Sequence, residues 1–305
     1  MRLKFKKFLL FKIIKSVRFL SITLIAGVIL CGCSDNKKDL RSSSVSEPLT
    51  KSKVITLSVE SKFMGRKMPC MIYLPKGYGN GKEYPVWYAL HGHSSNESMW
   101  LDEGIGNTAD KMIDNGEIEP IIMVFPYVKD ATVKEIMADM EDDGKFDERN
   151  IDKYLSKELI PYIDSHYYTV TSPKGRYIGG LSMGGMIALR VAFHHTDLFS
   201  KVGGYTAAVL SNDYSDKQLE EWLYPNDNFD HIKNINEFDK KKGFDKLNIY
   251  IEAGNADDPF SEGLQSLYKA LQTRGIDVNF RLYNGGHSLQ TDSLGDYLKF
   301  YAEKD

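Results

Sequence analysis

The sequence of 305 residues contains few cysteines, which excludes a fold held together by disulfide bonds. Two of the three, Cys31 and Cys33, lie near the N-terminus, so Cys70 is the only thiol in the rest of the chain. One cysteine cannot form an internal disulfide. Cys70 lies in an apolar, strand-like segment, and we therefore expect it to be buried as a small hydrophobic residue.

The sequence also lacks an excess of basic residues outside its first segment. Residues 1–32 contain seven Lys or Arg and no acid, and the remaining chain has 32 basic residues against 42 acidic ones. A domain with this acidic balance repels a phosphate backbone, and we find no basic stretch with interleaved aromatic residues. Nucleic acid is therefore excluded as the substrate or partner.

The N-terminal apolar run, Phe19–Cys31, is too short to span a bilayer comfortably. It has 13 residues, whereas a transmembrane helix needs about 20. A basic stretch precedes this run, as in a signal peptide. Its end resembles the lipobox of bacterial lipoproteins, in which a small residue precedes the lipidated cysteine. Gly32 before Cys33 fits this pattern, whereas the bulky Leu30 before Cys31 does not. An uncleaved signal anchor that begins at Phe8 is the alternative.

Residues 34–52 contain almost no large apolar side chains, which indicates a flexible segment. We therefore predict a lipoprotein signal peptide at residues 1–32, a flexible tether at 33–53 and one globular domain at 54–305. This organisation implies an extracytoplasmic protein that is anchored to a bacterial membrane through lipid on Cys33.

Short apolar segments alternate with segments of helical periodicity from residue 54 onward. This order predicts an α/β fold with a mostly parallel central sheet and helices on both faces. In such sheets the active site lies at the carboxyl ends of the strands. The predicted strands are 54–59, 70–74, 86–90, 121–125, 177–179, 202–205, 247–251 and 278–283, and the predicted helices are 151–165, 183–193, 262–273 and 289–303.

A glycine-rich turn, Gly180-Leu181-Ser182-Met183-Gly184, lies between a predicted strand and a predicted helix. A serine on such a tight turn points outward from the sheet, and its strained backbone requires small residues two positions away on each side. The five-residue pattern is common by itself, but its position between a strand and a helix makes it specific. We predict that Ser182 is the nucleophile of a serine hydrolase.

A general base and an acid follow Ser182 in the chain order that α/β-hydrolases use. His287 lies on a glycine-flanked loop after the last predicted strand, where it can fold over the nucleophile. The acid follows strand 247–251, where Asp257 and Asp258 compete. We favour Asp257, three residues after Gly254, and Glu252 is a third alternative that still lies within the strand.

The segment His91-Gly92-His93 follows a predicted strand at the place where the second oxyanion-hole N–H is expected. We assign the oxyanion hole to the backbone N–H groups of His93 and Met183. No third ligand of suitable spacing lies near the two histidines, so we predict no metal and no cofactor. His91 is expected to brace this loop by hydrogen bonds.

Aromatic residues near strand ends are candidates for the walls of a substrate pocket, although each is equally compatible with an ordinary core position. The polar segment 205–244 is a candidate lid, with a surface insertion as the alternative. The pocket candidates are Trp100, Tyr127 and Tyr205, with Phe260 in addition.

The motifs together resemble one family, "Putative esterase", over residues 54–303. The family includes feruloyl and acetyl-xylan esterases of carbohydrate esterase family 1, S-formylglutathione hydrolases, tributyrin esterases, enterochelin esterases and mycolyltransferases. Its catalytic triad corresponds to Ser182, Asp257 or Asp258, and His287, and His93 stands where members vary. The resemblance is carried by Tyr73-Leu74-Pro75, Tyr84-Pro85-Val86, His91-Gly92, Glu158-Leu159-Ile160-Pro161-Tyr162-Ile163, Gly180–Gly185 and Gly286-His287.

The resemblance implies a serine carboxylesterase that works through an acyl-enzyme. Export to the cell surface favours acylated carbohydrate as substrate, with feruloyl or acetyl esters, over a cytosolic thioester. A siderophore esterase and a short-chain acylglycerol esterase are alternatives within the family. A non-catalytic binding protein on a hydrolase scaffold is an alternative of another class, and a peptidase is disfavoured because no propeller-like domain is present.

Overall fold

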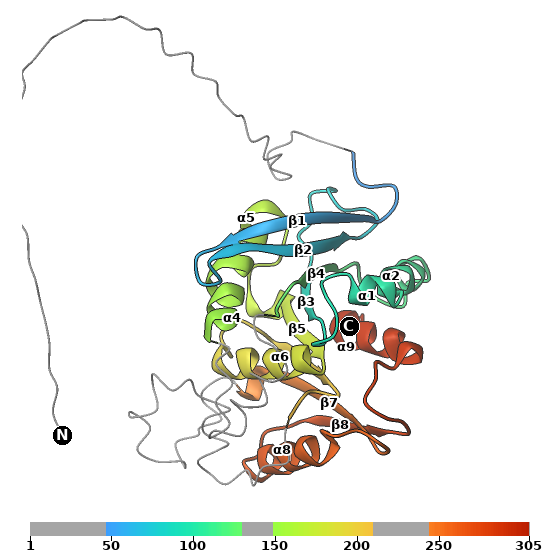
Figure 1. Cartoon of the computed structure of the whole chain (residues 1–305). Coiled ribbons are helices and arrows are strands. Elements are labelled where there is room, and N and C mark those ends of the chain that lie inside the picture. Colours follow the sequence, from blue (N-terminus) through green and yellow to red (C-terminus); the bar gives the residue numbers. More distant parts are fainter. Residues whose placement is uncertain (1–46, 130–148, 210–243, 305) are drawn as a thin grey trace, which may run out of the picture. The chain divides into compact units, whose positions relative to one another are not determined.

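The computed structural model describes residues 47–129, 149–209 and 244–304. These residues form one sheet of eight strands in the order β1-β2-β4-β3-β5-β6-β7-β8 (Figure 1). β1, β2 and β4 pair antiparallel, and every pair from β4 to β8 is parallel. The strands are β1 (Lys53–Ser61), β2 (Arg66–Leu74), β3 (Val86–Leu90), β4 (Ile122–Pro126), β5 (Arg176–Leu181), β6 (Lys201–Tyr205), β7 (Asn248–Gly254) and β8 (Asn279–Tyr283).

Helices cover both faces of the sheet, so the central strands are buried on both sides. Every residue of β3 is buried. Its successive residues Trp87 and Tyr88 point to opposite faces of the sheet, each into a separate hydrophobic core cluster. One face is covered by α4 (Arg149–Tyr154), the π-helical turn η1 (Leu155–Leu159), α5 (Ile160–His166), α6 (Met183–His194) and α8 (Ser261–Thr273). The other is covered by α1 (Met99–Asp102), α2 (Ile105–Asp114) and α9 (Leu294–Ala302) (Figure 1).

The α/β-hydrolase fold predicted from the sequence is confirmed, because each of the eight predicted strands is present. β7 continues to Gly254, three residues beyond its expected end, and this extension moves the start of the following loop. The helices α1 and α2 were not predicted. Short 3-10 turns, η2 (Pro173–Gly175), η6 (Phe244–Lys246) and η7 (Thr291–Ser293), connect the longer elements.

Cys70 is fully buried in β2, as predicted, and burial raises the pKa of its thiol far above the usual range. Within the three described ranges, no helix has the length and apolar character needed to cross a membrane. Cys33, the signal segment and most of the lid candidate 205–244 lie outside the described residues.

Candidate active site

Ser182 lies on the turn between β5 and α6, and its backbone adopts φ 54° and ψ −118°. This conformation is costly for a residue with a side chain and persists only where the surroundings impose it. A Cβ atom on Gly180 would lie 2.5 Å from the backbone carbon of Gly184, and one on Gly184 would lie 2.5 Å from the carbonyl oxygen of His91. Both flanking positions therefore require glycine, as the sequence pattern indicated.

The turn after β6 holds the Ser182 backbone from both sides. The Ser182 N–H donates to the Tyr205 carbonyl at 2.9 Å, and the Ala208 N–H donates to the Ser182 carbonyl at 3.0 Å. The intervening Thr206 has φ 41° and its own N–H donates to the Glu252 carbonyl in β7. The strained turn is thus fixed to two neighbouring strands.

His287 contacts Ser182 from the loop that follows β8. The Ser182 Oγ–H donates to His287 Nε2 at 2.8 Å, and His287 Nδ1–H donates to Asp258 Oδ1 at 3.1 Å. The Asp258 side chain is fully buried, whereas that of His287 is 25% exposed. Serine, histidine and carboxylate therefore form one continuous hydrogen-bonded relay, the geometry that acyl transfer requires.

The environment of Asp258 keeps its carboxyl ionised. Burial acts to raise its pKa, but hydrogen bonds from His287 and from the backbone N–H groups of Gly254 and Phe260 outweigh burial, so the pKa lies below its usual value. An ionised carboxylate only accepts hydrogen bonds, so the proton of the neutral imidazole resides on Nδ1. Nε2 is then free to accept the Ser182 proton.

The structure corrects the preference for Asp257 as the third member. Asp257 is exposed and has φ 56°, a left-handed conformation that aspartate tolerates in turns. β7 extends to Gly254, and the loop that follows it turns back so that Asp258 accepts the Gly254 N–H at 3.0 Å. Asp258, the alternative that the sequence left open, therefore faces His287.

Glu252, the third alternative, lies apart from the relay. Its carboxylate is buried among tyrosines, accepts hydrogen bonds from Tyr250 at 2.8 Å and from Tyr297 of α9, and lies 3.8 Å from Arg281. Burial raises its pKa. Glu252 thus belongs to the core between β7 and α9, not to the candidate site.

The loop after β3 lies against Ser182, as the expected oxyanion hole requires. A Cβ atom on Gly92 would lie 3.7 Å from Ser182 Cβ, which shows how closely this loop approaches the serine. His91 braces it as predicted: its Nε2 accepts the Val128 N–H at 3.1 Å and its Nδ1 donates to the Gly92 carbonyl at 2.8 Å. Burial lowers the pKa of His91, which favours the neutral ring that this pattern needs.

The two proposed oxyanion donors differ in how the fold presents them. Met183 is the first residue of α6, and N–H groups in the first turn of a helix have no carbonyl partner within that helix. His93 follows Gly92 in the loop beside Ser182 and is partly exposed. The positive end of the α6 dipole points toward the same place.

The structure removes Trp100 and Tyr205 from the set of pocket candidates. Both are fully buried: Trp100 donates its indole N–H to the Leu90 carbonyl, and Tyr205 donates its hydroxyl to Tyr301. They pack against each other in the core under α9, at a centroid distance of 5.7 Å. Trp100 points inward from α1 and Tyr205 from the end of β6, so both side chains lie in the core cluster that α9 covers and not in the crevice above the sheet.

Two other aromatic residues lie nearer the candidate site, Phe260 beside the relay and Tyr127 beside the loop that follows β3. Tyr127, which follows β4, is partly exposed and lies 5.2 Å from the His91 ring. Phe260 lies 5.0 Å from the His287 ring, edge to face, and its backbone N–H donates to Asp258 at 3.1 Å. Both remain candidates for contact with a substrate.

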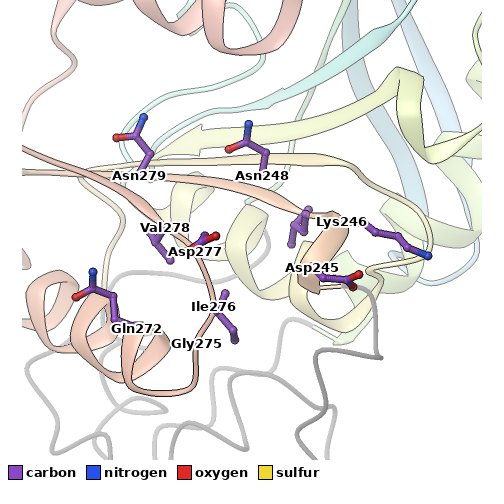
Figure 2. Close-up of a pocket in the computed structure, with 10 residues that line it drawn as sticks. Asp245, Lys246, Asn248, Gln272, Gly275, Ile276, Asp277, Val278 and Asn279 are labelled. Atoms are coloured by element: carbon purple, nitrogen blue, oxygen red, sulfur yellow. The ribbon is translucent and has the colours of Figure 1, made fainter.

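A separate cavity lies at the opposite edge of the sheet, where β7 and β8 begin (Figure 2). Its lining is mainly polar and includes Asp245, Lys246, Asn248, Asp277 and Asn279. The catalytic candidates follow the carboxyl ends of β5, β7 and β8, so this cavity is not the substrate pocket of the relay.

Sequence reasoning missed the backbone donors of Gly254 and Phe260. An N–H group belongs to every residue except proline and therefore leaves no signal in the residue type. A correct prediction of the end of β7 would have identified these two donors, because their positions depend on where the following loop turns.

The comparisons with known proteins agree with this geometry. The family model described as "Putative esterase" matches residues 61–291. An endo-1,4-beta-xylanase/feruloyl esterase from Xylanibacter ruminicola is 32% identical over 169 residues, which cover 53% of this chain and 22% of that protein. The chain thus spans less than a quarter of that relative's length.

Solved structures of ferulic acid esterases share the fold. One has a TM-score of 0.65 at 25% identity and covers 82% of this chain and 98% of its own. The ferulic acid esterase of Anaeromyces mucronatus, solved with ferulic acid, has a TM-score of 0.61 at 21% identity and covers 88% and 95%. With its family model matched over most of the chain, and with the serine-histidine-aspartate relay in place, the chain belongs to the "Putative esterase" family of α/β-hydrolases.

Proposed function

We propose that the protein is a serine carboxylesterase that hydrolyses feruloyl or acetyl esters of carbohydrates through an acyl-enzyme. The observation that carries the proposal is the relay from Ser182 through His287 to the buried Asp258. A small-molecule ester or a polysaccharide ester can serve as substrate, and no cofactor takes part.

In the first half-reaction, Ser182 Oγ attacks the ester carbonyl while its proton passes to His287 Nε2. The backbone N–H groups of His93 and Met183 hold the oxyanion of the tetrahedral intermediate. His287 then protonates the leaving alcohol as the carbon–oxygen bond breaks, which leaves an acylated Ser182.

In the second half-reaction, water takes the place of the alcohol. His287 removes a proton from water as the oxygen attacks the acyl carbonyl, and it returns that proton to Ser182 Oγ as the acid departs. Asp258 stabilises the imidazolium that forms in both halves and keeps the ring oriented.

The feruloyl and acetyl preference rests on the relatives and on the signal segment. The Xylanibacter ruminicola relative is named as a xylanase and feruloyl esterase, and the Anaeromyces mucronatus structure holds ferulic acid. We further propose that the mature chain is anchored to a bacterial membrane by lipid on Cys33 and acts outside the cytoplasm. There, acylated polymers are available as substrates.

A substrate panel tests the proposal. Purified protein is incubated with p-nitrophenyl acetate, methyl ferulate, feruloylated xylan and acetylated xylan, and Ser182→Ala serves as the control. We expect release of ferulate or acetate that the variant abolishes. Cleavage of tributyrin or of an iron-loaded trilactone siderophore, without release of ferulate or acetate from xylan, would support an esterase activity and refute the carbohydrate substrate. Folded wild-type protein that does not react with a fluorophosphonate probe would instead support a non-catalytic binding protein.

A further inference from the structure

The loop that carries His287 gains conformational freedom from two adjacent glycines. Gly285 and Gly286 precede the histidine, and glycine has the greatest backbone freedom of all residues. A general base must be held close to its working geometry, since a displacement of about 1 Å can cost a factor of about 100 in rate. The loop therefore needs a fixed point from outside its own backbone.

One side chain supplies hydrogen bonds on both sides of the histidine. The Tyr283 hydroxyl lies 2.5 Å from the Gly286 carbonyl oxygen and 3.2 Å from the Ser288 carbonyl oxygen. Tyr283 is the last residue of β8 and is only 5% exposed. It joins carbonyl groups on either side of His287 to the buried last residue of β8, the strand at the edge of the sheet.

The phenol has a single proton, so the shorter bond to Gly286 is the principal one. Burial raises the pKa of Tyr283, and the hydroxyl thus remains a donor across the pH range in which a serine esterase works. The Ser288 carbonyl has a second donor in Gln290 Nε2, at 3.1 Å. The Gly286 carbonyl likewise accepts the Ser288 N–H at 3.0 Å. Both additional donors belong to the same loop, whereas Tyr283 ties the two carbonyls to β8.

The same strand end also connects the histidine loop to the aspartate loop. The Asn255 N–H donates to the Tyr283 carbonyl at 2.9 Å, and the Ala256 N–H donates to the Gly285 carbonyl at 3.0 Å. A Cβ atom on Gly254 would lie 2.3 Å from the Gly285 carbonyl oxygen, so the two loops are in direct contact. A shift of Tyr283 would therefore alter the distance between His287 and Asp258.

We infer that Tyr283 is a positioning residue for the proposed reaction, whose hydroxyl fixes the His287 loop in register with Asp258 and Ser182. This inference rests on the proposed function. It assigns Tyr283 no contact with substrate, and it distinguishes the hydroxyl from the ring, because a phenylalanine at this position retains the buried ring.

The experiment compares Tyr283→Phe with Tyr84→Phe as a matched control. Tyr84 is also 5% exposed, and its hydroxyl donates to the Gly77 carbonyl at 2.8 Å, but it precedes β3 and lies at the opposite edge of the sheet. The Michaelis parameters for p-nitrophenyl acetate and the Tm are measured for the full chain and both variants. We expect Tyr283→Phe to lower kcat about tenfold with KM within about twofold, and Tyr84→Phe to retain wild-type kcat despite a similar loss of Tm.

A double variant shows whether Tyr283 acts through the relay. In Asp258→Asn the relay is already broken, so adding Tyr283→Phe is expected to lower kcat by less than about threefold, because residues that act as a unit are not additive. Any of three results would overturn the inference. The first is an unchanged kcat in Tyr283→Phe, and the second is an equal loss of kcat in both tyrosine variants. The third is a full tenfold loss of kcat when Tyr283→Phe is added to Asp258→Asn. Wild-type protein without esterase activity would overturn the proposed function and this inference together, whereas active wild type with any of these three results overturns the inference alone.

Discussion

At the scale of single residues, Asp257 and Asp258 are neighbours in the chain with opposite environments. Asp258 is buried and accepts three hydrogen bonds, and Asp257 is exposed. We expect Asp258→Asn to lower kcat about 10³-fold or more, because an amide cannot hold the imidazole in the required tautomer or stabilise its charged form.

Asp257→Asn is the control and is expected to retain kcat within about twofold, since an exposed turn position tolerates the amide. Steady-state hydrolysis of p-nitrophenyl acetate by the two variants separates them. A larger loss of kcat in Asp257→Asn than in Asp258→Asn would instead identify Asp257 as the acid of the relay.

Gly184 and Gly106 differ in the space that an added methyl group would find. A Cβ atom on Gly184 would lie within 2.7 Å of backbone atoms of both Leu90 and His91, so Gly184→Ala must displace either α6 or the loop beside Ser182. We expect at least a tenfold loss of kcat together with a lower Tm. In Gly106→Ala, by contrast, the new methyl group meets only side-chain atoms, at 3.4 Å or more.

Gly106 lies in α2, where alanine is the better helix former, so its variant should gain up to about 0.5 kcal/mol and retain full activity. Thermal unfolding and kcat are measured for both variants. Equal effects of the two substitutions would show that the contact at Gly184 does not determine the geometry of Ser182.

At the scale of elements, the partly buried Asp152 joins α4 to the end of α6. It lies 2.6 Å from His195 Nε2 and 3.6 Å from His194 Nδ1, and its side chain is 15% exposed. Burial acts to raise the pKa of Asp152, but hydrogen bonds from the two histidines outweigh it and hold the pKa well below its usual range. The contacts between Asp152 and the two histidines therefore stabilise the fold only while Asp152 is ionised.

We expect Asp152→Asn to lower the free energy of unfolding by about 2 kcal/mol at pH 7. A carboxyl with a depressed pKa in the folded state stabilises above its unfolded pKa of about 3.9, and the contribution is lost progressively below that pH. The difference between wild type and variant should thus shrink as the pH falls below about 4. Urea unfolding at several pH values measures it, with the exposed Asp197→Asn as control; a difference that grows at low pH would contradict the linkage.

The elements also show what sequence patterns can and cannot predict. All eight strands were predicted because each is a short apolar segment between turn residues, whereas α2 buries only Ile105, Ala109 and Met112 and α1 has four residues. The serine turn and the histidine loop were placed correctly because glycine spacing reports backbone geometry. The choice between Asp257 and Asp258 depends on where β7 ends and its loop turns, and the burial of Trp100 in α1 and of Tyr205 at the end of β6 depends on how these elements pack against α9. Neither property is encoded in residue type.

At the scale of the whole molecule, the sheet brings together residues that are 105 positions apart in the chain. β5, β7 and β8 are parallel, so their carboxyl ends deliver the serine, the aspartate and the histidine to one edge. The antiparallel β1 and β2 lie at the other side of the sheet and supply no member of the relay. The relay thus depends on three strand ends, and the loop after β3 adds the proposed His93 donor. None of the described residues before β3 takes part in the proposed chemistry, so the N-terminal part of the chain can serve another purpose.

We propose that this purpose is membrane attachment through Cys33, and a single substitution tests it. Cys33→Ser removes the thiol that would accept lipid and should move esterase activity from the membrane fraction to the soluble fraction of cells that express the full chain. Cys31→Ser is the matched control, because Leu30 before it is too bulky for a lipobox, and its activity should remain with the membrane. Incorporation of labelled palmitate should follow the same pattern, since stable anchoring requires acyl chains. Membrane-bound activity without palmitate on either variant would support the uncleaved signal anchor from Phe8 in its place.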